Sequence, residues 1–202
     1  MARVLAVANQ KGGVGKTTTA VNVASCLAEV GYKTLLVDLD PQGNATTGVG
    51  IDPRTLYSSM YQVLVGQKTI EETIIETPMQ RLFVVPSNLD LAGAEIELVS
   101  VFSRELRLRN AIAMVQDSYD YVIIDSPPSL GILTINGLAA AEEIKKIIGQ
   151  EKIDPKKDIM NEVNIILKDY IISLMKPLEN ESFFDKKDKL NVILISGVNG
   201  VG

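Results

Sequence analysis

The chain has 202 residues, with 20 Lys and Arg against 25 Asp and Glu, so its formal net charge is −5. This acidic balance gives no whole-molecule reason to expect a nucleic-acid binder, and any such contact would need a local basic patch. With a single cysteine and no histidine, the sequence excludes an internal disulfide, Ser-His-Asp or Cys-His catalysis, and the common zinc ligand sets.

The N-terminal region carries no targeting signal that we can identify. No apolar run of about 18 residues is present, and the first residues, MARVLAVANQ, lead into a glycine-rich loop without a cleavage pattern. We therefore expect a cytoplasmic protein with no membrane partner. Cys26 lies within an apolar helical pattern, so we interpret it as a packed thiol rather than a nucleophile.

Short apolar runs alternate with helical patterns through the first 140 residues. The expected strands are RVLAVA (3–8), TLLVDL (34–39), RLFVVP (81–86) and YVIID (121–125). Such runs are typical of parallel strands covered on both faces. Helical spacing follows the first strand up to Gly31 as its C-cap, and residues 91–115 supply helix before the fourth strand. The sequence predicts an α/β fold, a P-loop NTPase-like parallel sheet flanked by helices.

A phosphate-binding loop is expected at NQKGGVGKTTT (9–19), because this stretch follows a strand and opens a helix. Its glycines remove the β-carbons that would keep backbone amides away from an anion. Lys16 would place a charge at the β- and γ-phosphates, and the Thr17 hydroxyl would bind Mg²⁺. The alternative is a flexible glycine turn. The expected nucleotide-binding residues are Lys11, Gly12, Gly13, Val14, Gly15, Lys16, Thr17 and Thr18.

The loop departs from the general G-x-x-x-x-G-K-[ST] form, because Gln10 occupies the position of the first glycine and Lys11 adds a second lysine. This deviant form resembles the ParA/MinD family of P-loop ATPases, closest to its Soj-type chromosome-partitioning branch. Further support comes from VDLDPQGNATTGVG, VVPSNLDLAGAE and YDYVIIDSPPSLGILTINGL, which follow the family's order and intervals. The resemblance covers residues 2–140.

The resemblance implies a dimerisation switch that binds and hydrolyses ATP with Mg²⁺ and serves chromosome or plasmid partitioning. It implies catalytic roles for Lys11, Lys16 and Asp40, with Lys11 reaching the nucleotide of the partner subunit and Asp40 positioning the attacking water. A solvent-exposed lysine and a turn-capping aspartate are the alternatives for Lys11 and Asp40. Gly12 corresponds to a position where the dimer packs closely around ATP. The implied metal ligands are Thr17, Asp38 and Asp125, the last ending a strand as a Walker B aspartate does.

Partners also follow from the resemblance. It implies a nucleotide-dependent homodimer, a ParB-like protein that stimulates hydrolysis, and binding to non-specific DNA. The basic C-terminal helices that such proteins use on DNA are not recognisable in this sequence, which leaves DNA binding open.

The composition changes near residue 141, with 4 Lys and 6 Arg up to Ala140 but 10 Lys and no Arg beyond it. We therefore divide the chain into a ParA/Soj-like core (1–140) and a C-terminal segment (141–202) that is largely helical. Residues 158–176 show helical spacing, and LNVILIS (190–196) is a possible fifth strand. Both would cover the sheet edge that a four-stranded core leaves exposed.

The C-terminal segment has its own resemblance. Residues 142–202 look like the end of the N domain and the start of the G domain of the signal-recognition-particle receptor GTPase. The final GVNGVG resembles a second P-loop that stops at Gly202 before its Lys-Thr. This favours a chimera or fusion, and a glycine-rich tail without such a history is the alternative. The competing functions are a nucleotide-binding module without turnover or partitioning activity, and a receptor-like GTPase fragment.

Overall fold

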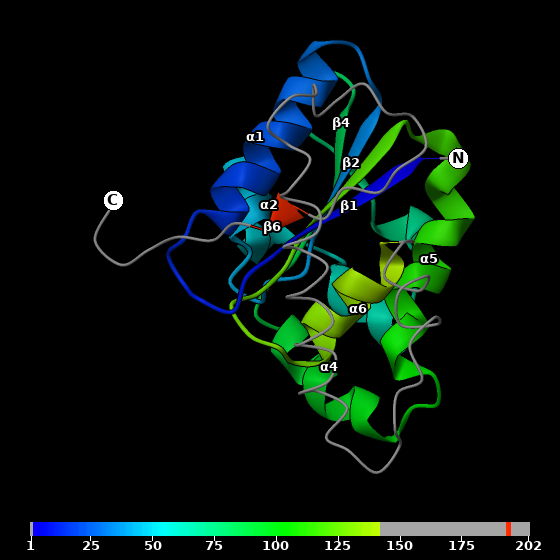
Figure 1. The fold of residues 1–202 in the computed structure, drawn as a ribbon. Coiled ribbons are helices and arrows are strands. Elements are labelled where there is room, and N and C mark those ends of the chain that lie inside the picture. The colour runs from blue at the N-terminus through cyan, green and yellow to red at the C-terminus, as the bar shows by residue number, and fades with distance from the viewer. Residues whose placement is uncertain (1, 142–192, 195–202) are drawn as a thin grey trace, which may run out of the picture. The chain divides into compact units, whose positions relative to one another are not determined.

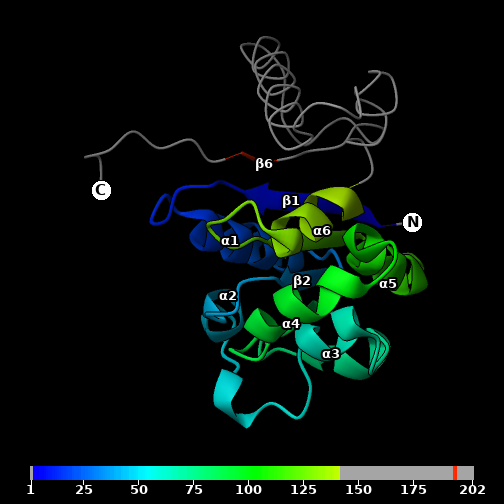
Figure 2. The same cartoon turned by 90° about the horizontal axis from the view of Figure 1, so that it is seen from below.

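The computed structural model describes residues 2–141 and 193–194. They form an α/β fold, in which helices cover both faces of one sheet (Figures 1 and 2). The strands are β1 (Arg3–Ala8), β2 (Thr34–Asp38), β3 (Ile75–Glu76), β4 (Leu82–Val85), β5 (Tyr121–Asp125) and β6 (Ile193–Leu194). The α-helices are α1 (Lys16–Glu29), α2 (Asn44–Gly48), α3 (Met60–Val65), α4 (Leu91–Glu97), α5 (Arg107–Val115) and α6 (Ile132–Ala140). The predicted fold class is confirmed.

The strand order in the sheet is β3-β4-β2-β5-β1-β6, and every neighbouring pair is parallel except β3 with β4. The chain therefore crosses over after β1, since β5 lies between β1 and β2. In this register Asp125 of β5 stands opposite Val7 on one side and Asp38 on the other. Two aspartates thus end neighbouring strands at the carboxyl edge, where ligands of open α/β sheets bind.

Alternate strand residues face the two helical layers, as the period of a β-strand requires. On one face Leu5, Leu36 and Ile123 pack into a buried cluster with Ala20 and Ala24 of α1. The opposite face is covered by α6 and α5, and α3 and α4 lie beside them (Figure 2). Burial on both faces explains why the strands read as nearly continuous apolar runs.

The four predicted strands and the first helix are confirmed within two residues, and Gly31 follows the helix with φ +103°. The helix predicted over residues 91–115 is interrupted between α4 and α5. The backbone is extended at Val101 and adopts a left-handed conformation at Ser103. Our interpretation of Cys26 as a packed thiol is wrong. Its side chain is exposed, since it lies on the side of α1 opposite the buried Ala20 and Ala24.

The possible fifth strand at 190–196 is represented by β6, whose two residues pair in parallel with Val7 and Ala8 of β1. The predicted helix at 158–176, the second P-loop at the end of the chain and most of the C-terminal segment lie outside the described residues. The division into 1–140 and 141–202 stays a prediction.

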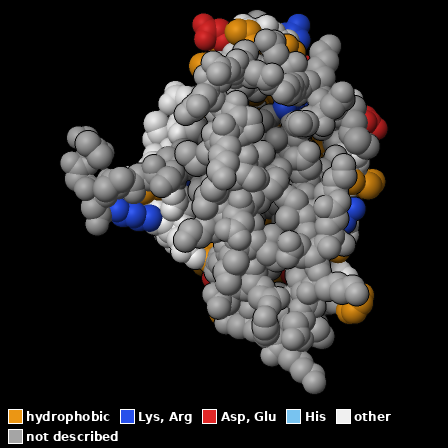
Figure 3. Space-filling model, in the orientation of Figure 1, with side chains coloured by type: hydrophobic (Ala, Val, Ile, Leu, Met, Phe, Trp, Pro, Cys, Tyr) orange, Lys and Arg blue, Asp and Glu red, His pale blue; other side chains and the backbone are white. Residues whose placement is uncertain are grey.

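Within residues 2–141 and 193–194, no helix is both long and apolar enough to span a bilayer. Hydrophobic side chains and charged side chains of both signs appear along the visible rim of the described residues in Figure 3. The exposed large apolar side chains are Val30, Tyr32, Tyr57, Leu89, Ile96, Val99, Phe102 and Met114.

Gly43 is the glycine whose replacement should cost the fold most. It precedes α2 with φ +63°, and an added β-carbon would lie 2.9 Å from the backbone oxygen of Ser87 and 3.1 Å from Pro53 Cγ. Gly31 also has a positive φ, +103°, but no atom of the described part of the chain lies within 4 Å of such a carbon. The two positions share backbone strain and differ in steric clash.

We predict that Gly31→Ala lowers the free energy of unfolding by about 1 kcal/mol, from the left-handed backbone alone. Gly43→Ala should lower it by about 3 kcal/mol, because the clash with Ser87 and Pro53 adds to the strain. Urea unfolding of the two variants measures this difference. Equal losses would contradict the packing described around Gly43.

Candidate functional site

The loop between β1 and α1 has the backbone of an anion site. Gly13 and Gly15 have φ of +70° and +87°, and Gly15 caps α1 without any side-chain hydrogen bond. The first backbone amides of α1 therefore donate no hydrogen bond to a capping side chain. A phosphate at the helix N-terminus would accept hydrogen bonds from these amides. Lys11, Gly12 and Thr18 of the same loop are exposed.

Lys16 is held inside this loop rather than extended into solvent. Its side chain is 6% exposed, and its Nζ donates to the backbone oxygen of Lys11 at 2.9 Å. The Lys11 amide in turn donates to Asn9 Oδ1 at 3.0 Å. An ammonium group has three donors, so Lys16 can hold the loop and still donate to a phosphate oxygen.

Asp125 differs from the other carboxylates of the site in its lack of hydrogen-bond partners among the described residues. It is fully buried, and within the described part of the chain neither of its carboxylate oxygens has a hydrogen-bond partner. Burial raises the pKa of this carboxyl to about 7, the charges of Asp38 and Asp40 add to the rise, and the nearby Thr17 hydroxyl and Lys16 charge oppose it. A buried carboxylate without donors is costly unless a cation binds it.

The oxygen ligands at this point fit Mg²⁺, which prefers carboxylates and hydroxyls. Thr17 lies close enough to Asp125 to affect the pKa of its carboxyl, as our prediction of a shared metal site requires. The described residues contain no cluster of three or more His, Cys, Asp or Glu side chains that could hold a metal. Protein ligands would therefore be few, as is usual for Mg²⁺ that is also bound by nucleotide phosphates.

Asp38, by contrast, already accepts three hydrogen bonds. Its Oδ1 accepts the Asp40 amide at 3.0 Å, and its Oδ2 accepts the Thr46 amide at 2.8 Å and the Thr46 hydroxyl at 2.7 Å. Burial raises the pKa of Asp38 to about 6, and these hydrogen bonds limit the rise. The role predicted for Asp38 beside the metal stays a prediction.

Asp40 is 8% exposed, and its Oδ1 accepts the amide of Gln42 at 2.9 Å. Its charge also affects the pKa values of Asp38 and Asp125, so the three carboxylates lie near one another. The structure thus brings Lys16, Asp38, Asp40 and Asp125 to one edge of the sheet. It places Lys11 and Gly12 on the exposed side of the loop.

Sequence reasoning missed Thr46 and Ser87. Both are fully buried, and the Ser87 amide donates to Thr46 Oγ1 at 2.9 Å. Thr46 lies in a run of small polar residues without periodicity, so no pattern separates it from its neighbour Thr47. Only the fold brings α2 and the segment after β4 together.

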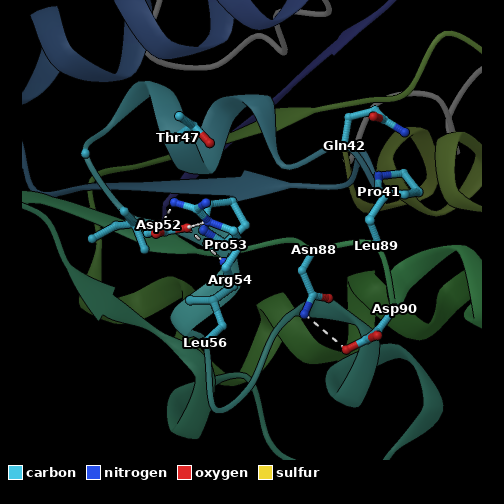
Figure 4. A pocket seen from close by; sticks show the side chains of 12 residues that line it. Pro41, Gln42, Thr47, Asp52, Pro53, Arg54, Leu56, Asn88, Leu89 and Asp90 are labelled. Atoms are coloured by element: carbon cyan, nitrogen blue, oxygen red, sulfur yellow. Dashed lines mark hydrogen bonds and ion pairs between the residues drawn. The ribbon is translucent and has the colours of Figure 1, made fainter.

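A cavity of about 940 Å³ lies beside this network and not at the P-loop (Figure 4). It is walled by the chain that follows β2 and by the chain that follows β4. The lining residues are Pro41, Gln42, Thr47, Gly50, Ile51, Asp52, Pro53, Arg54, Leu56, Asn88, Leu89 and Asp90.

Comparisons with known proteins show the family of the chain. The family described as AAA domain matches residues 2–153. The sporulation initiation inhibitor protein Soj of Bacillus subtilis is 42% identical over 200 residues, which are 98% of this chain and 79% of Soj. The chain belongs to the ParA/Soj family of deviant Walker A ATPases. The chromosome partitioning protein ParA of Myxococcus xanthus is 51% identical over 142 residues, 70% of this chain and 50% of that protein.

Solved structures match the ParA/Soj fold of the chain as well. The cobyrinic acid a,c-diamide synthase of Mycobacterium smegmatis, crystallised with ADP and magnesium, aligns with a TM-score of 0.68 and 49% identity. This match covers 69% of the present chain and 57% of the synthase chain. The chain therefore spans only about half the length of several relatives, although it spans more of Soj.

The alignment with Soj covers 98% of the chain, so the ParA/Soj resemblance is not confined to residues 2–140. The comparisons provide no evidence for a chimera with the signal-recognition-particle receptor. That resemblance of residues 142–202 falls outside the described residues.

The raised pKa values predict how pH affects stability in the absence of nucleotide. A carboxyl whose folded pKa of about 7 exceeds its usual 3.8 binds its proton more tightly in the folded state. Its ionisation therefore costs no stability below pH 4, an increasing amount between pH 4 and 7, and the full amount above pH 7.

We predict that Asp125→Asn raises the free energy of unfolding at pH 8 by roughly 2–4 kcal/mol and changes it little at pH 4. Urea unfolding of the nucleotide-free proteins across this pH range measures the effect. A variant less stable than the wild type at pH 8 would contradict this, because the Asp125 carboxylate would then be stabilised by a partner in the nucleotide-free protein.

Proposed function

We propose that this chain is a Mg²⁺-dependent ATPase whose ATP-bound form dimerises, in a switch of the chromosome- or plasmid-partitioning type. The observation that supports this most directly is the buried Asp125 carboxylate, whose oxygens have no hydrogen-bond partner among the described residues and which lies next to Thr17 and Lys16 of the P-loop. A cation bound together with nucleotide phosphates would supply a positive charge that balances the carboxylate.

Each residue of the site has a proposed role that follows from its position. Lys16 and the first amides of α1 would bind the β- and γ-phosphates, and Thr17 and Asp125 would hold Mg²⁺, which supplies charge neutralisation when bound. Asp40 would position the water that attacks the γ-phosphate. By resemblance, the exposed Lys11 would reach the nucleotide of a second subunit and stabilise charge there, as an arginine finger does.

The partners that we propose are a second copy of the chain, a ParB-like protein that stimulates hydrolysis, and non-specific DNA. Relatives named for chromosome partitioning support this assignment. We propose a cytoplasmic location on the same grounds.

We predict that calorimetric titration detects binding of ATP with Mg²⁺ and weaker binding of GTP, and that Lys16→Ala abolishes the ATP signal. Lys68→Ala, a lysine outside the P-loop, should bind as the wild type does. Asp40→Ala should keep ATP binding but lower the rate of phosphate release by about 10²-fold or more, because the water loses its positioning group.

Binding without phosphate release in the wild type would instead favour a nucleotide-binding module without turnover. A preference for GTP would favour the receptor-like GTPase alternative. Full wild-type turnover in both Lys16→Ala and Asp40→Ala would contradict the assignment of the site.

A substitution at Gly12 can test dimerisation separately from nucleotide binding. Among residues 2–141, an added β-carbon there would approach only Pro128 Cβ, at 4.0 Å, so this part of the chain has room for a side chain. We predict that Gly12→Val retains ATP affinity within about threefold but no longer sediments as a dimer with ATP, since close subunit packing has no space for the side chain. An ATP-dependent dimer of this variant in analytical ultracentrifugation would contradict the proposed interface.

A further inference from the structure

We propose that Thr46 is a positioning residue for ATP hydrolysis, which holds Asp38 and, through Asp38, the segment that carries Asp40. This inference rests on the proposed function, because it assigns Asp40 to the attacking water. It is drawn from a continuous set of buried hydrogen bonds that links the ends of β2 and β4.

This series of hydrogen bonds begins at Ser87, two residues after the end of β4 at Val85. The Ser87 amide donates to Thr46 Oγ1 at 2.9 Å, and Thr46 Oγ1 lies 2.7 Å from Asp38 Oδ2. A backbone amide can only donate, so the Thr46 hydroxyl accepts from Ser87 and its own proton is directed at Asp38. The hydroxyl therefore has one orientation, and it fixes Asp38 Oδ2 as an acceptor.

The second oxygen of Asp38 extends the set toward Asp40. Asp38 Oδ1 accepts the Asp40 amide at 3.0 Å, and Asp40 Oδ1 accepts the Gln42 amide at 2.9 Å. The plane of the Asp38 carboxylate is thus set by Thr46 on one side, and it sets the backbone of Asp40 on the other. Because carboxylate position decides whether a water is aligned, a shift of about 1 Å can reduce turnover about 10²-fold.

Thr46 and Thr47 form a matched pair for testing this. Both lie in α2, but Thr46 is fully buried and contacts Asp38, whereas Thr47 is exposed and its hydroxyl donates to the Gly43 oxygen at 3.0 Å within the same helix. Valine has the shape of threonine without its hydroxyl, and serine keeps the hydroxyl. The loss of the hydroxyl can therefore be separated from the loss of packing.

The experiment compares the wild type with Thr46→Val, Thr46→Ser and Thr47→Val in two measurements. The first is steady-state phosphate release with MgATP, and the second is amide hydrogen exchange at Asp40 by NMR. We expect Thr46→Val to lower kcat about 10–100-fold with KM changed less than about twofold, and to speed exchange at Asp40 about tenfold. Thr46→Ser and Thr47→Val should stay within about threefold of the wild type in both.

The outcomes distinguish this inference from the proposed function. If the wild type releases no phosphate but Thr46→Val still speeds exchange at Asp40, the proposed function fails and the positioning by Thr46 stands. If the wild type turns over ATP and Thr46→Val has an unchanged kcat, the inference is overturned. Equal losses in Thr46→Val and Thr46→Ser would overturn it too, because packing and not the hydroxyl would then be responsible.

Discussion

The site depends on one unfavourable arrangement, a buried carboxylate at the end of a central strand. Asp125 is fixed there by β5, which pairs on both sides, and its side chain finds no donor among the described residues. Burial of the carboxylate raises its pKa to about 7, so near neutral pH the apo protein is destabilised by its ionised form. Proteins keep such groups where a ligand compensates them, and we propose that Mg²⁺ with nucleotide at the neighbouring P-loop is that ligand.

The two strand-end aspartates differ because of the chain that follows each of them. Asp38 ends β2 as Asp125 ends β5, and the two stand opposite each other in the sheet. The chain after Asp38 turns back through α2 and supplies Thr46 as a double donor, whereas the chain after Asp125 leaves through Pro127 and Pro128, which lack amide donors. Asp38 therefore organises the backbone, whereas the oxygens of Asp125 have no hydrogen-bond partner among the described residues, which is why we propose that they bind a cation.

Much of this fold could be predicted from the sequence because its strands are buried on both faces. Apolar runs of this kind, with a glycine-rich loop between the first strand and helix, identify the sheet and the phosphate site. The short elements could not be predicted, since β3 has two residues and α2 has five, and tertiary contacts rather than propensity form them. The exposure of Cys26 was missed because apolar spacing in α1 was read without its phase relative to Ala20 and Ala24. The contact between Thr46 and Ser87 joins residues 41 positions apart, which no local pattern indicates.

We propose that Mg²⁺ together with nucleotide compensates the buried Asp125 carboxylate. The most direct test is the free energy of unfolding in saturating ATP, measured once with Mg²⁺ and once with EDTA, for the wild type and Asp125→Asn. We expect Mg²⁺ to add stability beyond that of ATP alone in the wild type, by binding the folded state, and most of this gain to be lost in Asp125→Asn. An equal gain from Mg²⁺ in both proteins would contradict it.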